Sequence, residues 1–147
     1  HARFRLSTDM FIKAIYTYEK IGLPHHHNVI VALRHLANLR HTEQSEKYYE
    51  KALKLCEESN DPLFETIYLE QGDFYFNTRR YSLAEKSYLV CLKLKANKED
   101  SVTLHLYAHL AYIHIELCNY NEGEAYLLKS FEIQIELKVK QTDEQRI

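Results

Sequence analysis

Two histidines in the sequence have a spacing that could bind a metal ion. His105 and His109 stand four residues apart, which places both imidazoles on one face of a helix. The segment has no His-Glu-x-x-His motif, however, and a third ligand would have to come from another helix. We therefore expect neither a metal nor a cofactor. A second group, His25, His26 and His27, falls in a predicted connection, where we expect these side chains to face solvent.

The sequence has no motif that would support catalysis. The chain contains 3 glycines, and we find no phosphate-cradling loop, no nucleophile elbow and no pair of carboxylates that converges with a base. We therefore expect a protein that is not an enzyme.

The three cysteines, Cys56, Cys91 and Cys118, are odd in number and widely spaced. This pattern fits neither a disulfide framework nor paired zinc ligands. Because free cysteine is among the most buried residue types, we expect each of them to pack as a small apolar side chain in a reducing, cytoplasmic compartment.

The composition indicates one helical domain. The chain has 147 residues, of which 46% are hydrophobic and 27% are charged, as in globular proteins. Its 3 Gly and 2 Pro are too few for the tight turns of an all-β chain. A net charge of -2 gives no reason to expect binding to nucleic acid. No apolar run approaches the roughly 18 residues of a membrane span. The chain begins at His1 rather than Met, so we expect a fragment of a longer protein.

A pattern of side-chain sizes recurs along the chain at nearly equal intervals. A large residue is followed three positions later by a small one and then at once by another large one, and a further small residue stands four positions before each set. The sets are Phe11-Ala14-Ile15, Tyr49-Ala52-Leu53, Tyr88-Cys91-Leu92 and Leu127-Ser130-Phe131, preceded by Ser7, Ser45, Ala84 and Gly123. Such an internal repeat indicates stacked copies of one structural unit.

A second pattern lies between these sets. Residues at spacings of three and four form one face of a helix, and the small residue that ends each group allows a neighbouring helix to approach. The groups are Leu33-Leu36-Ala37, Tyr68-Gln71-Gly72 and Tyr107-Leu110-Ala111. The unit is therefore a helix A, a short turn and a helix B. We expect helices over residues 7–21, 29–40, 43–58, 63–77, 81–96, 102–117 and 121–140.

Turn residues agree with these helices. Gly22 tolerates a positive φ and Pro24 breaks a helix, so together they end the first one. Residues 77–80 and 118–121 fall where turns between helices A and B belong. No proline closes the helices that contain Cys91 and Ser130, which predicts that both helices run on.

The two patterns together resemble the tetratricopeptide repeat family. They read Tyr68-x₂-Gln71-Gly72-x₂-Tyr75 in helix A and Ala84-x₃-Tyr88-x₂-Cys91 in helix B. Residues 14–29 and the long units look like the kinesin-light-chain style of this repeat. The resemblance implies an all-α fold, a right-handed α-solenoid of stacked antiparallel helix pairs with about three and a half repeats.

The resemblance also divides the chain, which we expect to form a single domain over residues 1–147. The parts are helix B of a preceding repeat (7–21), three repeats (29–58, 63–96 and 102–140) and a polar tail (141–147). Core positions include Tyr49, Tyr68, Tyr88 and Tyr107. The last helix carries Phe131, Ile133, Ile135, Leu137 and Val139 and looks uncapped. We expect self-association or further repeats at that helix.

Helix A of each repeat lines the concave inner face of such a solenoid, and the resemblance implies that this groove binds peptide segments of partner proteins. The resemblance assigns partner binding to Arg34, Asn38, Leu69, Asp73, Phe76, His105, His109, Tyr112 and Glu116, with His41 and Glu70 at neighbouring positions. One subset of the family grips C-terminal carboxylates with basic residues and asparagines. Arg34 and Asn38 match that pattern, but Glu70 would repel a carboxylate. We therefore favour a groove of mixed charge, with Phe76 and Tyr112 as anchors.

Two functions remain open at this point. The first is a non-catalytic adaptor or scaffold that binds a protein or peptide partner in the helix A groove, without direct contact with nucleic acid or membrane. The second is the ligand-sensing domain of a bacterial peptide-pheromone-type regulator, which uses similar long repeats. A DNA-binding helix pair before His1 would favour the second.

Overall fold

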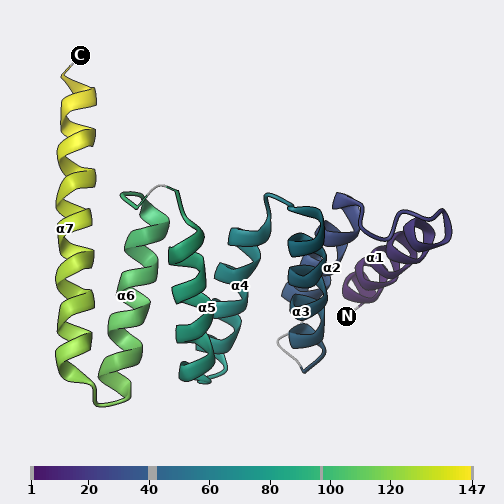
Figure 1. Cartoon of the computed structure of the whole chain (residues 1–147), viewed down its shortest axis with the longest axis horizontal. Coiled ribbons are helices and arrows are strands. Elements are labelled where there is room, and N and C mark those ends of the chain that lie inside the picture. Colours follow the sequence, from purple (N-terminus) through teal and green to yellow (C-terminus); the bar gives the residue numbers. More distant parts are fainter. Residues whose placement is uncertain (1, 40–42, 97, 147) are drawn as a thin grey trace. The chain divides into compact units, whose positions relative to one another are not determined.

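A computed structural model describes residues 2–39, 43–96 and 98–146 of the chain. The regular secondary structure of these described residues is entirely helical (Figure 1). The helices are α1 (Ala2–Lys20), α2 (His27–Leu39), α3 (Glu43–Ser59), α4 (Phe64–Asn77), α5 (Tyr81–Leu94), α6 (Ser101–Glu116) and α7 (Tyr120–Gln145). The predicted alternation of helices A and B is therefore present along the chain. None of the described helices is both long and apolar enough to cross a lipid bilayer.

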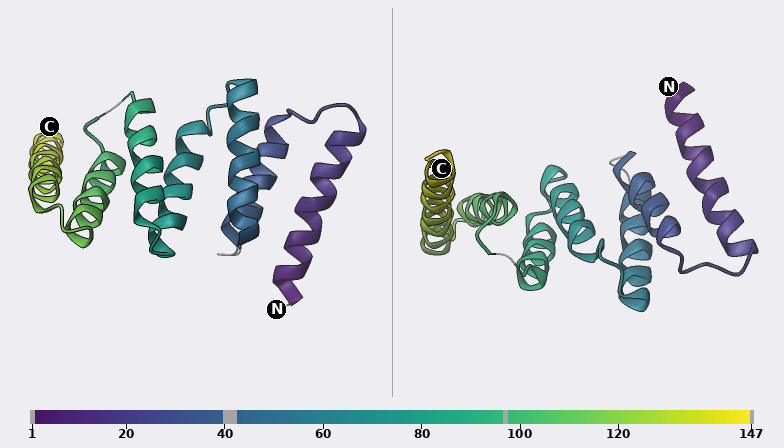
Figure 2. Two further views of the ribbon diagram at one scale, coloured as in Figure 1. Left: turned by 60° about the horizontal axis from the view of Figure 1, so that its bottom comes forward. Right: turned by 90° about the horizontal axis from the view of Figure 1, so that it is seen from above.

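Packing divides the chain into two compact units, which we call unit 1 (residues 1–79) and unit 2 (residues 80–147). Unit 1 contains α1 to α4, and unit 2 contains α5 to α7. Within each unit, every helix packs against the helix that follows it in the sequence (Figure 2). This neighbour-on-neighbour packing is the arrangement that an internal repeat produces.

The core of unit 1 follows the predicted spacing of apolar residues. Ile30 and Leu33 of α2 are almost fully buried, and Tyr49 and Cys56 are buried on α3, which packs against α2. Residues at intervals of three, four and seven lie on one side of a helix, so each helix presents a continuous apolar stripe to its neighbour. Ile67 of α4 extends this core and is fully buried.

The core of unit 2 is built in the same way. Tyr88 of α5 is fully buried, as are Leu106, Leu110 and Ile113 of α6. Gly123 allows α7 to pack closely on α6, because a Cβ at this position would lie 3.0 Å from the Cγ1 of Ile115. The predicted small residue before the last repeat set therefore has a packing role. Of the four tyrosines expected in the core, Tyr49 and Tyr88 are buried, whereas Tyr68 and Tyr107 are half-buried.

The predicted turns are present, and three of them contain a residue with positive φ that is not glycine. Gly22 has a φ of 79°, as expected for a residue that ends a helix. Arg79 and Cys118 end α4 and α6 with φ values of 59° and 61°. Asn60 has a φ of 52° in the connection after α3. The expectation that all three cysteines are buried is wrong for Cys118, because the turn holds it at the surface.

Two helices are longer than the sequence predicts. Helix α1 begins at Ala2 rather than residue 7, since no glycine or proline interrupts its first turns. Helix α7 continues to Gln145, so residues 141–145 of the expected polar tail are helical although they are exposed. Lys140, the residue just before this extension, donates to the Glu99 carboxylate at 2.7 Å. The prediction that the helix containing Ser130 runs on is therefore correct.

The same prediction is wrong for the helix that contains Cys91, because α5 ends at Leu94. Lys95 then turns into an extended conformation, and its buried ammonium donates to the Asp100 carboxylate at 2.8 Å. Asp100 is also the N-cap of α6, since its carboxylate accepts from the backbone N–H of Thr103 at 2.8 Å. A half-buried ion pair, whose carboxylate also caps the start of α6, thus accompanies the end of α5 in place of a proline.

Candidate functional site

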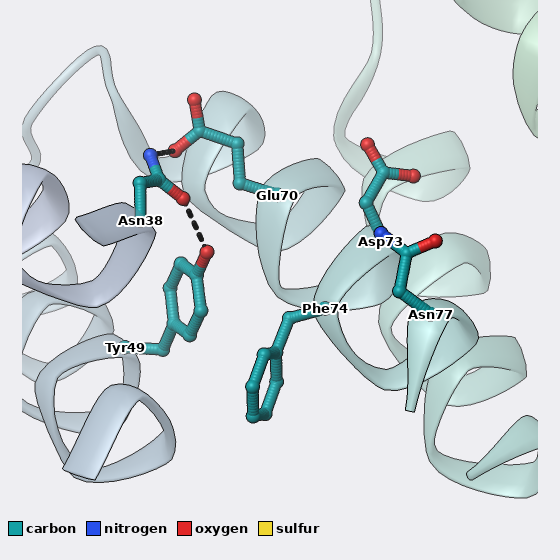
Figure 3. Close-up of a pocket in the computed structure, with 6 residues that line it drawn as sticks. All are labelled: Asn38, Tyr49, Glu70, Asp73, Phe74 and Asn77. Carbon is teal, nitrogen blue, oxygen red and sulfur yellow. Dashed lines mark hydrogen bonds between the residues drawn. The ribbon is translucent and has the colours of Figure 1, made fainter. Parts of the chain in front are cut away.

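A cavity of about 260 Å³ opens on unit 1 between α2, α3 and α4 (Figure 3). Five of the six side chains that line it carry a polar group, and the sixth is an aromatic ring. They are Asn38, Tyr49, Glu70, Asp73, Phe74 and Asn77. Glu70, Asp73 and Asn77 lie one helical turn apart on α4, so their spacing alone brings them to one edge of the cavity. We call this cavity the α2–α4 pocket.

A network of hydrogen bonds fixes one wall of the α2–α4 pocket. The Arg34 guanidinium donates to both carboxylate oxygens of Glu70, with Nε distances of 3.0 and 2.8 Å. Asn38 Nδ2 donates to Glu70 Oε2 at 3.0 Å and, in turn, Asn38 Oδ1 accepts from the Tyr49 hydroxyl. Each of the three helices therefore contributes at least one member. Because every member is held by another, the polar groups of this wall are oriented before any ligand arrives.

The electrostatics of the pocket are acidic. The hydrogen bond to Glu70 is the largest cause that raises the pKa of Arg34, so this arginine stays charged and neutralises its partner. Burial raises the pKa of Tyr49, and the negative charges of Glu70 and Asp73 raise it further. Arg34 is paired with Glu70, and Asp73 adds a second carboxylate to the lining of the cavity.

The structure brings three of the predicted unit 1 residues to one place and leaves two aside. Arg34 belongs to the network, and Asn38 and Asp73 line the pocket. Leu69 and Phe76 are half-buried on α4 and do not line it. His41, which was expected beside them, lies outside the described residues.

The sequence interpretation missed three residues that line the pocket. Tyr49 was assigned to the core, Phe74 had no role, and Asn77 was assigned to a turn. The spacing of Glu70, Asp73 and Asn77 could have identified the polar edge, because residues three and four apart share a helix face. Nothing in the sequence pairs Arg34 with Glu70, which lies on a different helix 36 residues away.

In unit 2, the predicted residues lie on α6 among aromatic rings of α5. The His105 and His109 rings are 4.0 Å apart between centroids, and His109 Nδ1 donates to the His105 carbonyl at 2.9 Å. The buried ring of Tyr88 meets both imidazoles edge-on. Tyr112 is exposed and packs edge-on against Tyr81.

The fourth predicted residue of unit 2, Glu116, is exposed at the end of α6. Its negative charge is the largest cause that raises the pKa of Tyr112 one helical turn away. This face of α6 therefore combines aromatic surface with a carboxylate.

The three consecutive histidines are exposed, as expected, but each has a partner in unit 1. His25 Nδ1 lies 3.1 Å from a Glu58 carboxylate oxygen, and the His26 ring stacks on Tyr18. His27 Nδ1 donates to Asp61 Oδ2 at 2.7 Å. The His25 and His27 contacts tie the connection and the first residue of α2 to the end of α3 and to Asp61 just after it, whereas His26 packs back on α1. The sequence did not indicate this structural role.

Asp61 is itself buried and has a second contact, because its Oδ1 accepts from the backbone N–H of Leu63 at 2.9 Å. The same carboxylate thus shapes the start of α4 and holds the start of α2 through His27.

Comparison with known proteins connects this arrangement with repeat proteins. A family model, tetratricopeptide repeat, matches residues 36–59, 65–98 and 104–134, which are more than half of the chain. Protein O-mannosyl-transferase TMTC3 of Homo sapiens is 31% identical over 119 residues, which are 80% of this chain and 12% of that protein. The chain therefore spans only a small part of this relative.

Among solved structures, BtubC (BKLC) from P. vanneervenii has a TM-score of 0.80 and 16% sequence identity, covering 93% of this chain and 59% of that one. At this identity the likeness concerns the fold alone. The predicted fold class, an all-α solenoid of stacked helix pairs, is confirmed.

Proposed function

Because this chain belongs to the tetratricopeptide repeat family, we propose that it is a protein-interaction module in which the α2–α4 pocket binds a peptide segment of a partner protein. Such a module would act as an adaptor or scaffold. The observation that carries the proposal is the pocket itself, with polar groups from three helices held in place by the network of Arg34, Asn38, Tyr49 and Glu70.

The size and chemistry of the α2–α4 pocket suit a peptide better than a small molecule. Its volume of about 260 Å³ is below the roughly 300–1,000 Å³ of most small-molecule sites, and it accommodates one or two side chains. The amide of Asn77 offers a donor and an acceptor, and Asn38 keeps a second N–H and a second lone pair beside its bonds to Glu70 and Tyr49. A peptide backbone requires both kinds of group. This argument favours a peptide as the ligand of the pocket.

The charge of the pocket indicates which side chain it would accept. Glu70 is neutralised by Arg34, and Asp73 adds a carboxylate on the next turn of α4. A partner lysine or arginine would place its cation near Asp73 and its aliphatic stem against the rings of Tyr49 and Phe74. We therefore expect a basic residue at the centre of the bound segment. A C-terminal carboxylate would be repelled, so the carboxylate-clamp alternative is disfavoured.

The remaining predicted residues belong to the proposal as a second contact surface. His105, His109, Tyr112 and Glu116 form a face on α6 of unit 2 where aromatic rings could anchor a further part of the partner. The transferase activity in the name of TMTC3 is a property of that protein, and the non-catalytic role proposed for this chain rests on the absence of a catalytic motif in its sequence.

The test is selection of peptides from a random dodecapeptide phage library on the immobilised chain, followed by affinity measurement of labelled peptides by fluorescence anisotropy. We expect the selected peptides to share a lysine or arginine. Asn77→Arg adds bulk and positive charge at an exposed position of the pocket and should weaken binding about tenfold or more. Asn121→Arg makes the same change on α7 and is the matched control.

Peptides without a shared basic residue, or peptides that bind Asn77→Arg and the control equally well, would show that the α2–α4 pocket is not the binding site. Circular dichroism and thermal unfolding of each variant must match those of the unmodified chain, so that a lost peptide signal reports on binding.

A further inference from the structure

The hydrogen bonds beside the α2–α4 pocket have directions that the chemistry of their members fixes. The Arg34 guanidinium can only donate, so the Glu70 carboxylate that it binds accepts. Asn38 must therefore turn its Nδ2 group toward Glu70, and the distance to Oε2 is 3.0 Å. The Oδ1 atom of Asn38 then faces Tyr49, whose hydroxyl donates to it. We call these four residues the polar wall.

These directions decide what the polar wall can still offer to a ligand. The Tyr49 hydroxyl has given its one hydrogen to Asn38, so any further bond to this oxygen must come from a donor on the ligand. Glu70 likewise accepts only, and Asn38 keeps one N–H beside the one that Glu70 receives. The polar wall is thus rich in acceptors and poor in donors.

Burial keeps the polar wall in this arrangement. Tyr49 is 2% exposed, and the side chains of Arg34 and Glu70 are 28% and 20% exposed, so these bonds are largely shielded from water. Hydrogen bonds in such an environment are stronger than in water, and reversing one of them would leave a buried group without a partner. Asn38 is exposed, so its amide is the member that a ligand reaches most easily.

A second set of acceptors lines the same cavity on α4. Figure 3 shows Asp73 and Asn77 away from the three polar-wall residues that it draws. The Asp73 carboxylate adds acceptors and a negative charge, and the Asn77 amide adds one acceptor and two N–H donors. Because Arg34 neutralises Glu70, the charged groups of the polar wall and the lining carry one net negative charge.

A guanidinium group matches this arrangement better than an ammonium group. It has five N–H donors in a planar fork and no acceptor, and its single positive charge equals the negative charge of the pocket. The donors of the fork leave from three nitrogens, so they can bond acceptors on two sides of a cavity of about 260 Å³ at once. All donors of a lysine ammonium leave from one nitrogen. A guanidinium is also more weakly hydrated, so it enters the pocket at a lower cost.

We infer that the α2–α4 pocket selects an arginine side chain of the partner segment over a lysine, through the fixed acceptors of the polar wall and the carboxylate of Asp73. This inference rests on the proposed function, which requires only a basic residue. Tyr49 is a positioning residue in it, because its bond to Asn38 holds that amide in one orientation and leaves the phenol oxygen as an acceptor.

The test uses three small probes, the N-acetyl methylamides of arginine, lysine and citrulline. Citrulline has the length of arginine, but it is neutral and carries a carbonyl oxygen where arginine has an N–H donor group. NMR of the isotope-labelled intact chain follows the side-chain amide signals of Asn38 and Asn77 during each titration. We expect saturable shifts with the arginine probe, binding of the lysine probe that is about fivefold weaker, and binding of the citrulline probe that is weaker by about tenfold or more.

Two variants and a matched control connect this selectivity with the pocket. Asp73→Asn keeps the shape of the side chain but removes its charge, and it should weaken binding of the arginine probe about tenfold. Tyr49→Phe should reduce the preference for arginine over lysine to about twofold or less. A merely structural loss would weaken both probes alike and leave this ratio unchanged. Asp143→Asn makes the same change as Asp73→Asn at an exposed position of α7 and should bind like the unmodified chain.

The outcomes separate this inference from the proposed function. Equal affinity for the arginine and lysine probes, or a preference that Tyr49→Phe leaves undiminished, would refute the selection of arginine, while the pocket would remain a site for basic residues. If no probe shifts the amide signals but selected peptides still lose binding with Asn77→Arg, only the inference is refuted. If neither probes nor peptides bind in the pocket, both are refuted. A preference for arginine that depends on Tyr49 and Asp73 supports the inference.

Discussion

The Arg34 guanidinium on α2 binds both carboxylate oxygens of Glu70 on α4, and the same carboxylate accepts from Asn38. One carboxylate thereby joins helix A of the first repeat to helix A of the second. These bonds help to shape the α2–α4 pocket, because they hold Asn38 and Glu70 in place and both residues line the pocket.

The Arg34–Glu70 pair should stabilise unit 1 more than a surface ion pair does. Its side chains are 28% and 20% exposed, so the charges are partly shielded from water. We expect a double-mutant cycle of Arg34→Met and Glu70→Gln, measured by urea unfolding, to give a coupling energy of about 1–2 kcal/mol. The exposed pair Lys51–Glu19, with a distance of 3.3 Å, is the control and should give no more than about 0.5 kcal/mol. Equal coupling in the two cycles would contradict this view of the pocket wall.

The sequence predicted the helices well because their signals are local. Small residues such as Gly72 and Ala111 recur at fixed positions, and the apolar spacing that defines each helix is complete within that helix. The end of α5 was not predictable in this way. It depends on a buried Lys95 whose partner, Asp100, belongs to the next helix.

Asp100 should make unit 2 sensitive to acid. Burial by itself would raise the pKa of this carboxyl, but hydrogen bonds from Lys95 and Thr103 outweigh burial and hold its pKa below the ordinary value. A carboxyl whose pKa is lower in the folded chain stabilises the fold above its unfolded pKa, about 3.9, and loses this contribution as the pH falls through the folded pKa. The stabilising effect is therefore complete near neutral pH and fades below about pH 4.

Asp100→Asn keeps a residue that can cap α6 but removes the charge that faces Lys95. At pH 7 we expect it to lower the free energy of unfolding by about 2 kcal/mol, and we expect this difference to shrink steadily below pH 4. Urea unfolding at a series of pH values measures both effects. Asp9→Asn on the exposed surface of α1 is the control. If the difference in unfolding free energy between the variant and the unmodified chain stayed constant down to pH 2, the Asp100 charge would not contribute to stability.

The three thiols should differ sharply in reactivity. Cys56 and Cys91 are fully buried, and burial raises the pKa of the Cys56 thiol to about 11, so its reactive thiolate is scarce at neutral pH. Cys118 is exposed in the turn after α6. With dithiobis(nitrobenzoate) at pH 8, we expect one thiol to react quickly and the other two only after unfolding in urea. Cys118→Ser should remove the fast phase of this reaction. A fast phase that persists in the variant would show that the accessible thiol is not Cys118.

Gly123 should not tolerate a larger side chain. A Cβ added at this position would lie 3.0 Å from Ile115 Cγ1 and 3.3 Å from the backbone oxygen of Ala111. That oxygen cannot move away easily, because it belongs to the backbone of α6. We expect Gly123→Val to lower the free energy of unfolding by about 2 kcal/mol through overpacking. Ala125→Val introduces the same residue at an exposed position of α7 and should cost about 0.5 kcal/mol. Thermal unfolding that ranks the two variants equally would refute close packing at Gly123.

The candidate site was less predictable than the fold, for a physical reason. Positions along one helix can be assigned to a face from their spacing, which is why the sequence placed Asn38 and Asp73 on the faces that line the α2–α4 pocket. Whether a charged residue meets another depends on the distance between helices that are not neighbours in the sequence. Arg34 was therefore expected to offer a positive charge to a partner, whereas the structure shows it bound to Glu70. Tyr49 was recognised as a packing residue, but its hydroxyl reaches the pocket wall.

Arg79 and Cys118 occupy equivalent corners of successive repeats and share a left-handed backbone, although one side chain is a long cation and the other a thiol. The turn between helix A and helix B therefore requires a positive φ at this position, whichever amino acid occupies it. Each residue then carries a strain of about 1 kcal/mol that glycine would not. A laboratory selection for heat resistance should accordingly enrich glycine at both corners, and the gains should add, because the corners belong to different units.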